Sequence, residues 1–196
     1  MQLKHLWYLY PKIVSDQKVE EIVKFGLSES FLDGTLKVNN DDKDYKEYED
    51  KTFRRSKVSF LDRYQHSEIY DLVYNFVCEA NNKAFGFDIN RLETLQFTLY
   101  NEKDKGHYDW HPDTNWVEDE PSQRKLSIIM QLSNPSEYEG GVFELTDADF
   151  TNQDKFNLKQ KGSVLIFPSF IKHRVTPVTK GERKSLVGWI EGPSFR

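Results

Sequence analysis

Residues 106–116, GHYDWHPDTNW, contain two of the chain's five histidines, and each is followed two positions later by an aspartate. The pairs are His107 with Asp109 and His111 with Asp113. On an extended strand, side chains two apart point to the same face, so either pair offers an imidazole and a carboxylate to one cavity. Residue type and spacing leave both pairs open as metal ligands.

A third metal ligand must come from elsewhere in the chain. Beyond this cluster, His173 in FPSFIKHRVTPV is the only histidine of the C-terminal half. Two histidines and one carboxylate are the ligand set of non-haem Fe(II) oxygenases, which leaves other coordination positions open for substrate and dioxygen. Zinc bound by the same residue types for hydrolysis is the alternative.

An arginine stands ten positions after this histidine, at the start of the expected strand in GERKSLVGWI. Alternation places Arg183, Ser185, Val187 and Trp189 on one face. If that face lines a cavity, the guanidinium needs an anion, because a buried charge without a partner is very costly. The carboxylate of a ligand is the simplest anion, and an ion pair with one of the chain's 32 acidic residues is the alternative.

Three segments, YDWHPD, YEGGVFEL and LKQKGSVLIFPSFIKHRVTPVTKGERKSLVGWI, together resemble the iron- and 2-oxoglutarate-dependent dioxygenases of the prolyl 4-hydroxylase type. The resemblance covers about residues 94–192. It implies a double-stranded β-helix that holds Fe(II), with 2-oxoglutarate chelating the metal. It also implies that the catalytic metal ligands are His111, Asp113 and His173, and that Arg183 anchors the far carboxylate of 2-oxoglutarate.

The resemblance distinguishes the two histidine–aspartate pairs. The family has a tyrosine three residues before the first metal histidine, and Tyr108 has that place before His111, which leaves His107 and Asp109 as flanking or surface residues. Tyr100 matches a second family tyrosine that faces the cofactor. The chain has glutamine where many relatives carry a tyrosine, so the network around the carboxylate is expected to differ in detail. The expected cofactor-binding residues are Arg183, Tyr100, Tyr108, Ser185, Gln131 and Trp189.

The remaining pattern predicts one domain over residues 1–196, with helical support over about 1–92 and a catalytic β-helix core over about 93–192. SDQKVEEIVKFG predicts a helix with Ser15 or Asp16 as N-cap and Gly26 as its end, and SEIYDLVYNFVCEANN predicts a second helix. Short alternating runs from residue 93 predict strands. The expected fold class is α+β: a jelly-roll or cupin-like barrel with the N-terminal helices packed on one sheet.

Composition excludes several classes of protein. With 37% hydrophobic and 30% charged residues and no long apolar run, the chain is predicted to be globular, without a membrane span or signal peptide, and cytoplasmic. The formal net charge of −5 disfavours nucleic acid as a partner. Cys78, on the second predicted helix, is expected to be a core thiol. Residues 33–52 are expected to form a solvated loop, with a mobile lid as the alternative.

The resemblance implies hydroxylation of an unactivated C–H bond with dioxygen, coupled to conversion of 2-oxoglutarate to succinate, with ascorbate as reductant. The predicted substrate is proline within a peptide or protein, modified at C4 by family analogy. Two long segments, 33–52 and TNWVEDEPSQRK after the second aspartate, suit an extended substrate, with Trp116 expected to stack on it. The alternatives are a hydroxylase of a free amino acid or other small molecule, a non-catalytic cupin-like binding module, and an alkylated-base demethylase. Demethylase relatives carry an arginine where this chain has Trp189.

Overall fold

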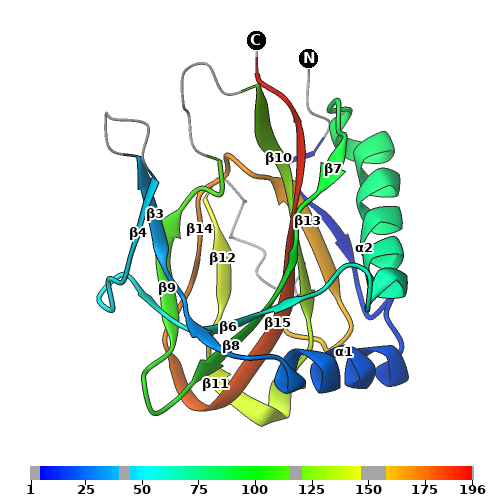
Figure 1. Cartoon of the computed structure of the whole chain (residues 1–196). Helices are drawn as coiled ribbons and strands as arrows, with labels where there is room; N and C mark the ends of the chain where they lie inside the picture. The colour runs from blue at the N-terminus through cyan, green and yellow to red at the C-terminus, as the bar shows by residue number, and fades with distance from the viewer. Residues whose placement is uncertain (1–4, 40–44, 115–120, 147–157, 196) are drawn as a thin grey trace.

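The computed structural model describes residues 5–39, 45–114, 121–146 and 158–195. Two antiparallel β-sheets face each other, and two α-helices lie against the outer side of the larger sheet (Figure 1). The helices are α1 (Asp16–Ser28) and α2 (Ser67–Ala80), followed by a π-helical turn at Asn81–Phe85, with a 3-10 turn at Pro135–Glu137. The strands are β1 (Tyr8–Tyr10), β2 (Leu32–Asp33), β3 (Leu36–Asn39), β4 (Tyr45–Tyr48), β5 (Arg54–Arg55), β6 (Lys57–Leu61), β7 (Arg91–Leu92), β8 (Leu95–Asn101), β9 (His107–His111), β10 (Ser122–Gln131), β11 (Tyr138–Gly140), β12 (Phe143–Leu145), β13 (Val164–Pro168), β14 (His173–Val175) and β15 (Val178–Pro193).

The strands of the described residues fall into three groups. The larger sheet has nine strands in the order β1-β13-β10-β15-β8-β6-β2, with β7 and β11 also pairing with β15. The smaller sheet has the order β12-β14-β9-β5, and β3 and β4 form a separate hairpin. Two facing antiparallel sheets with helices on one outer face confirm the expected α+β class and double-stranded β-helix.

The side chains of β10 pack into two hydrophobic clusters, one on each face of the larger sheet. Its residues Leu126, Ile128 and Met130 pack with the helices, whereas Ile129 packs in the cluster between the two sheets. The helices contribute Val19, Ile22, Ile69, Val73 and Val77 to the first of these clusters. Because strand side chains alternate, the polar residues that share the inner face with Ile129, which are Ser127 and Gln131, are directed to the space between the sheets.

Helix α1 confirms one predicted boundary and corrects the other. Ser15 is the N-cap, and its hydroxyl accepts a hydrogen bond from the backbone N–H of Lys18 at 3.3 Å. The helix runs past Gly26, which is buried, to Ser28. A Cβ at Gly26 would overlap the ring of Phe97, so this glycine allows close packing of helix on sheet instead of ending the helix.

The N-terminal part of the chain contains more strand than the sequence indicated. Within the segment 33–52, β3 and β4 pair in register, with Lys37 opposite Glu47, so the loop prediction was wrong for these strands. Strands β6 and β2 extend the large sheet, so the expected helical support is only part of this region. The loop prediction failed because a polar two-stranded ribbon is held by backbone hydrogen bonds and needs no apolar alternation.

Two further expectations concern the helices. Cys78 is a free thiol on α2, but it is half-buried, so it was wrong to expect it in the core. None of the described helices combines the length and the apolar character that crossing a bilayer requires.

Candidate metal centre and active-site cavity

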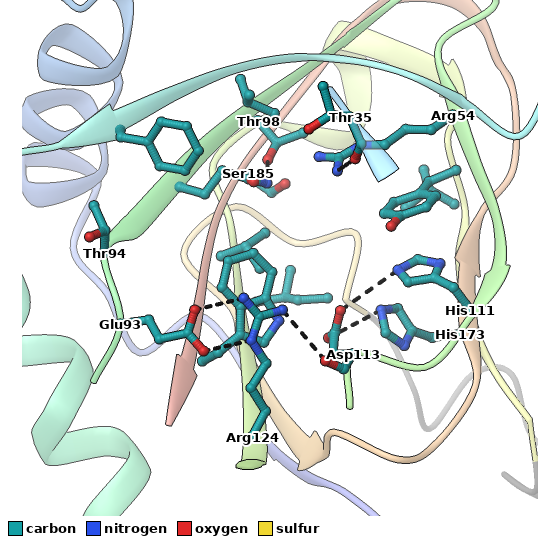
Figure 2. A pocket seen from close by; sticks show the side chains of 18 of the residues that line it. Thr35, Arg54, Glu93, Thr94, Thr98, His111, Asp113, Arg124, His173 and Ser185 are labelled. Atoms are coloured by element: carbon teal, nitrogen blue, oxygen red, sulfur yellow. Dashed lines mark hydrogen bonds and ion pairs between the residues drawn. The ribbon is translucent and has the colours of Figure 1, made fainter. Parts of the chain in front are cut away.

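Two histidines and an aspartate meet between the sheets. His111 is the last residue of β9 and lies opposite His173, the first residue of β14, in the register of the smaller sheet. Asp113 follows two residues after β9 ends, and its carboxylate lies 3.8 Å from Nε2 of His111 and 3.5 Å from Nε2 of His173 (Figure 2). One ligand atom from each residue falls within 4.8 Å of the others, which is a spacing that a single metal ion can bridge.

Asp113 does not come close to His111 through strand alternation, which was the reason that the sequence suggested. Asp113 lies beyond the strand, so simple alternation does not place it beside His111. Strand β9 also carries an irregularity: Tyr108 pairs with Val175 while His111 pairs with His173, so three steps on β9 match two on β14. This bulge brings Tyr108 and His111 to the cavity, and it changes which residues of the strand face inward.

Both imidazoles are oriented for metal binding. Nδ1 of His111 lies 2.6 Å from the carbonyl oxygen of Asp109, and Nδ1 of His173 lies 3.1 Å from that of Ile171. A carbonyl accepts only, so each Nδ1 carries the proton and each Nε2 lone pair faces the other ligands. A backbone acceptor behind each metal-facing imidazole is typical of metal sites, so the donor set fits an Fe(II) ion with the chemistry of a facial triad.

The protonation states agree with this orientation. Burial, followed by the nearby His173, lowers the pKa of His111 to about 3, so its imidazole is neutral at physiological pH. Burial alone would raise the pKa of Asp113, but His173, His111, Arg124 and a hydrogen bond from Ser127 together lower it below its ordinary value. A neutral imidazole and an ionised carboxylate are the forms that bind a metal.

Arg183 is a buried cation that faces the same cavity. Its residue is 2% exposed, and no hydrogen bond or ion pair joins its guanidinium to any residue in the described ranges. Its nearest aromatic neighbour is Tyr100, whose ring centroid lies 5.7 Å from the guanidinium carbon. A Cβ on Gly141 would lie 3.1 Å from Cδ of Arg183, so the glycine pair makes room for this side chain. A buried guanidinium without a carboxylate requires an anionic ligand.

A cavity of about 1390 Å³ joins the candidate residues. Its lining includes every predicted site residue except Gln131, namely Tyr100, Tyr108, His111, Asp113, His173, Arg183, Ser185 and Trp189. Gln131 is fully buried, and its amide nitrogen donates to the Tyr138 hydroxyl at 3.0 Å and to the Ser133 carbonyl at 3.2 Å. The structure therefore does not bring Gln131 to the cavity surface.

Tyr108, on β9, and Tyr100, on β8, both line the cavity. The Tyr108 ring stacks on the His111 imidazole, with centroids 3.5 Å apart, and the Arg54 guanidinium carbon lies 4.5 Å from the Tyr108 centroid. Burial raises the pKa of Tyr108 to about 12 and also raises the pKa of Tyr100. Both phenols are thus neutral hydrogen-bond donors at physiological pH.

Sequence reasoning missed an ion pair that closes one side of the cavity. Arg124 donates from Nε and Nη2 to the two carboxylate oxygens of Glu93, each at 2.6 Å (Figure 2). The same guanidinium lies 4.0 Å over the Trp189 ring, and its Nη1 is 3.5 Å from the carbonyl of Asp113. Trp189 thus lines the cavity as predicted. The only local signal for the ion pair was a basic residue at the start of a buried strand.

The remaining predicted residues do not reach the metal centre. Nδ1 of His107 lies 2.9 Å from the carbonyl oxygen of Lys105, and Nε2 lies 3.0 Å from that of Thr52. The side chain of Asp109 is exposed. These contacts agree with the expected flanking role of this pair. Trp116 lies outside the described residues.

Comparison with known proteins agrees with this geometry. The chain matches the model of the 2OG-Fe(II) oxygenase superfamily over residues 95–191. It is 32% identical over 135 residues to the PKHD-type hydroxylase YbiX of Escherichia coli, which is 64% of this chain and 56% of that protein. The chain spans less than two thirds of the length of its curated relatives, and only 33% of the PKHD-type hydroxylase IL0759 of Idiomarina loihiensis.

Solved structures resemble the whole fold. The viral collagen prolyl hydroxylase of Paramecium Bursaria Chlorella virus-1 aligns with a TM-score of 0.67 and 17% identity, covering 96% of this chain and 97% of that one. A prolyl hydroxylase of Trichoplax adhaerens aligns with a TM-score of 0.70 and 16% identity, covering 94% and 83%. The family match over residues 95–191 and the His-Asp-His cluster place the chain in the 2OG-Fe(II) oxygenase superfamily, and its fold is similar to that of prolyl hydroxylases of known structure.

Proposed function

We propose that this protein is an Fe(II)- and 2-oxoglutarate-dependent dioxygenase that hydroxylates a prolyl residue within a peptide or protein. The observation that carries the proposal is that one cavity holds both the His111–Asp113–His173 cluster and the guanidinium of Arg183, which has no ion-pair partner in the part of the chain that the structure describes. A metal site alone fits many reactions. A metal site that shares its cavity with a buried cation fits a co-substrate that chelates at one end and carries a carboxylate at the other.

Each protein group has a separate task in this proposal. The three metal ligands hold Fe(II), and Arg183 pairs with the distal carboxylate of 2-oxoglutarate, with Tyr100 and Ser185 beside it on the cavity wall. When bound, Fe(II) with 2-oxoglutarate and dioxygen supplies the chemistry that converts C–H to C–OH while 2-oxoglutarate becomes succinate and carbon dioxide. Ascorbate serves as the reductant that keeps the metal in the ferrous state.

Apolar side chains around the metal ligands limit water. Phe143, Ile129 and Val187 line the cavity, and the ring of Phe143 lies 5.5 Å from that of His173. Tyr108 covers one face of the His111 ring. An apolar surround strengthens the charge interactions inside the site and excludes water from the reacting centre.

The size of the cavity supports a polypeptide substrate. Ligand pockets for small molecules usually measure about 300–1,000 Å³, and this cavity of about 1390 Å³ exceeds that range. Besides the metal ligands and Trp189, its lining includes Leu32 on the edge strand β2 and Phe60 on the neighbouring strand β6, so the cavity extends well beyond the three ligands. The similar Trichoplax adhaerens structure is a complex with a peptide fragment, which favours the same class of substrate here.

The test supplies iron-loaded protein, 2-oxoglutarate and ascorbate with proline-containing peptides, free proline and methylated single-stranded DNA in parallel. Succinate release and product mass are measured. The proposal expects a gain of one oxygen on peptides, assigned to C4 of proline by NMR. Oxygen added only to free proline would reject the polypeptide substrate, and demethylated DNA would place the protein with the base demethylases. Failure to bind both iron and 2-oxoglutarate would leave a cupin-like binding module.

A further inference from the structure

The carboxylate of Asp113 has a partner that is not a metal ligand. The Ser127 hydroxyl donates to Oδ2 of Asp113 at 2.6 Å, and the Ser169 hydroxyl lies 2.9 Å from that of Ser127. Both serines are fully buried, and they come from different strand regions, Ser127 from the middle of β10 and Ser169 from just after β13. Burying a hydroxyl costs free energy unless it is hydrogen-bonded, and the hydrogen bonds of these two serines lead to the Asp113 carboxylate.

Counting protons fixes the direction of this chain of hydrogen bonds. A serine hydroxyl has one proton, and that of Ser127 goes to the ionised carboxylate, which can only accept. The contact between the two serines must therefore run from Ser169 to Ser127. The resulting chain, Ser169 to Ser127 to Asp113, has a single orientation. A hydrogen bond to an ionised acceptor is also among the stronger ones in a protein.

The hydroxyls act on the carboxylate and not on the backbone that carries it. The carbonyl of Ser169 accepts from the backbone N–H of Asp113 at 2.8 Å and of Thr114 at 3.2 Å. The Thr114 hydroxyl donates to the carbonyl of Arg124 at 2.7 Å. These bonds hold the segment whether or not position 127 or 169 carries a hydroxyl. What the two hydroxyls control is the rotation of the Asp113 side chain.

We propose that Ser127 and Ser169 are positioning residues that lock the Asp113 carboxylate in one rotation, so that Oδ2 is held by Ser127 and Oδ1 is presented for the metal. Oδ1, 3.8 Å from Nε2 of His111, has no hydrogen-bond donor among the described residues. The fit of the site to a metal therefore depends on a residue that does not touch the metal. Removing partners of this kind from metal ligands typically weakens metal binding about 10–100-fold.

The test measures metal affinity instead of turnover. Ser127→Ala is titrated with Co(II) or Mn(II) in the absence of 2-oxoglutarate, by calorimetry and by the visible spectrum of the Co(II) form. The expected result is a metal Kd raised about 10–100-fold, and a Co(II) spectrum that differs from that of the parent. Ser169→Ala should show the same change more weakly, because Ser127 keeps its own bond to the carboxylate. Ser127→Thr keeps a hydroxyl and should restore most of the affinity.

A matched control separates positioning from general loss of structure. Ser59 is also fully buried on a strand, and its hydroxyl donates at 2.7 Å to the carbonyl of Gly26, away from the metal cluster. Ser59→Ala should lower the melting temperature without changing the metal Kd. If Ser127→Ala does not fold, Ser127→Cys keeps the shape with a much weaker donor and takes its place. A folded Ser127→Ala or Ser127→Cys variant that binds metal within about twofold of the parent would overturn the proposal.

Discussion

Strands β9 and β15 each bring functional side chains to the same cavity, but they do so in different ways. On β15, Arg183, Ser185, Val187 and Trp189 all line the cavity, as strict alternation requires. On β9, alternation fails between Tyr108 and the last residue of the strand, because an extra residue is inserted opposite β14. Strand β15 follows the alternation in its sequence, and strand β9 does not.

The difference follows from how each strand is paired. β15 pairs with β10 over Ser185–Pro193 on one side and with β8 over Glu182–Val187 on the other, so its register is fixed by many backbone hydrogen bonds. β9 is five residues long and lies between the short strands β14 and β5. A short strand near a sheet edge tolerates a bulge, and a bulge redirects side chains toward a site. Sequence alternation therefore predicted the inward face of β15 but not that of β9.

The sharpest way to break this comparison is to remove, one at a time, the two histidines that pair across β9 and β14, His111 and His173. His111→Ala should bind no stoichiometric Fe(II) and should lose 2-oxoglutarate turnover to background, because only one histidine and one carboxylate of the ligand set would remain to hold the ion. His173→Ala should behave in the same way. Iron content of the purified protein and succinate release measure the two effects. If His111→Ala retained both iron and turnover, the bulged register would be wrong.

The next largest effect is expected from Arg183 on β15, the strand that follows strict alternation. Arg183→Ala should raise the 2-oxoglutarate Kd roughly 30- to 700-fold, since a buried charge-assisted contact is worth about 2–4 kcal/mol and each 1.4 kcal/mol is tenfold. Arg183→Lys should recover part of the affinity, because the charge remains but the planar fork is lost. The 2-oxoglutarate Kd of each variant is measured by calorimetric titration of the iron-free protein with 2-oxoglutarate in the presence of Zn(II).

A second readout from the same variant distinguishes a ligand anchor from a structural ion pair. Arg183 has no ion-pair partner among the described residues, so replacing it leaves no buried carboxylate without a partner. The melting temperature of the ligand-free protein should therefore not fall. A large loss of stability with unchanged 2-oxoglutarate binding would assign Arg183 to the structure.

How much of the site was predictable depends on whether a recognisable motif marks its residues. The candidate ligands His111, Asp113 and His173 and the candidate anchor Arg183 were predicted, although His111 and His173 stand 62 positions apart, because their motifs resemble those of a known family. The ion pair of Arg124 with Glu93 joins residues 31 positions apart, and the Ser127 contact with Ser169 joins residues 42 apart. No local pattern fixes such contacts, because strand order decides them. One signal was present: Ser127 is a polar residue inside the apolar run LSIIM.

The same limit applied to the fold. The helices were predicted because amphipathic periodicity is a local property, and Ser15 was identified as a cap by its type and place. The β3–β4 hairpin was missed because the segment is polar and its pairing is a backbone property. Gly26 was misread because the contact with Phe97 that requires a glycine comes from a strand about seventy residues away.

A smaller effect concerns pH and the metal-free protein. The pKa of His111 is lowered to about 3 in the folded state, mainly by burial, whereas an unfolded histidine titrates near 6.5. Below pH 6.5 the unfolded chain binds a proton that the folded chain does not, so the stability from this group is complete above pH 6.5 and is lost as the pH falls toward 3. The loss should be at most about 1.4 kcal/mol per pH unit.

Denaturant unfolding of metal-free protein at pH 7.0, 6.0 and 5.0 measures this loss. His111→Gln should show a shallower decline than the parent, since an amide does not titrate. Arg183→Gln serves as the control from the other strand and should keep the parent's slope, because a guanidinium keeps its charge throughout this range. Equal slopes for the parent and His111→Gln would mean that the imidazole is not buried in the neutral form.

The smallest expected effect is at His107, which the bulge keeps away from the metal. Its ring nitrogens lie 2.9 Å and 3.0 Å from the backbone carbonyl oxygens of Lys105 and Thr52. His107→Ala should therefore cost about 0.5–1.5 kcal/mol of stability at most, with iron content and 2-oxoglutarate turnover unchanged. Thermal unfolding and succinate release check both points in one preparation. Inactivity of His107→Ala together with an active His111→Ala would move the metal site to the first histidine–aspartate pair, and β9 would then follow the same alternation as β15.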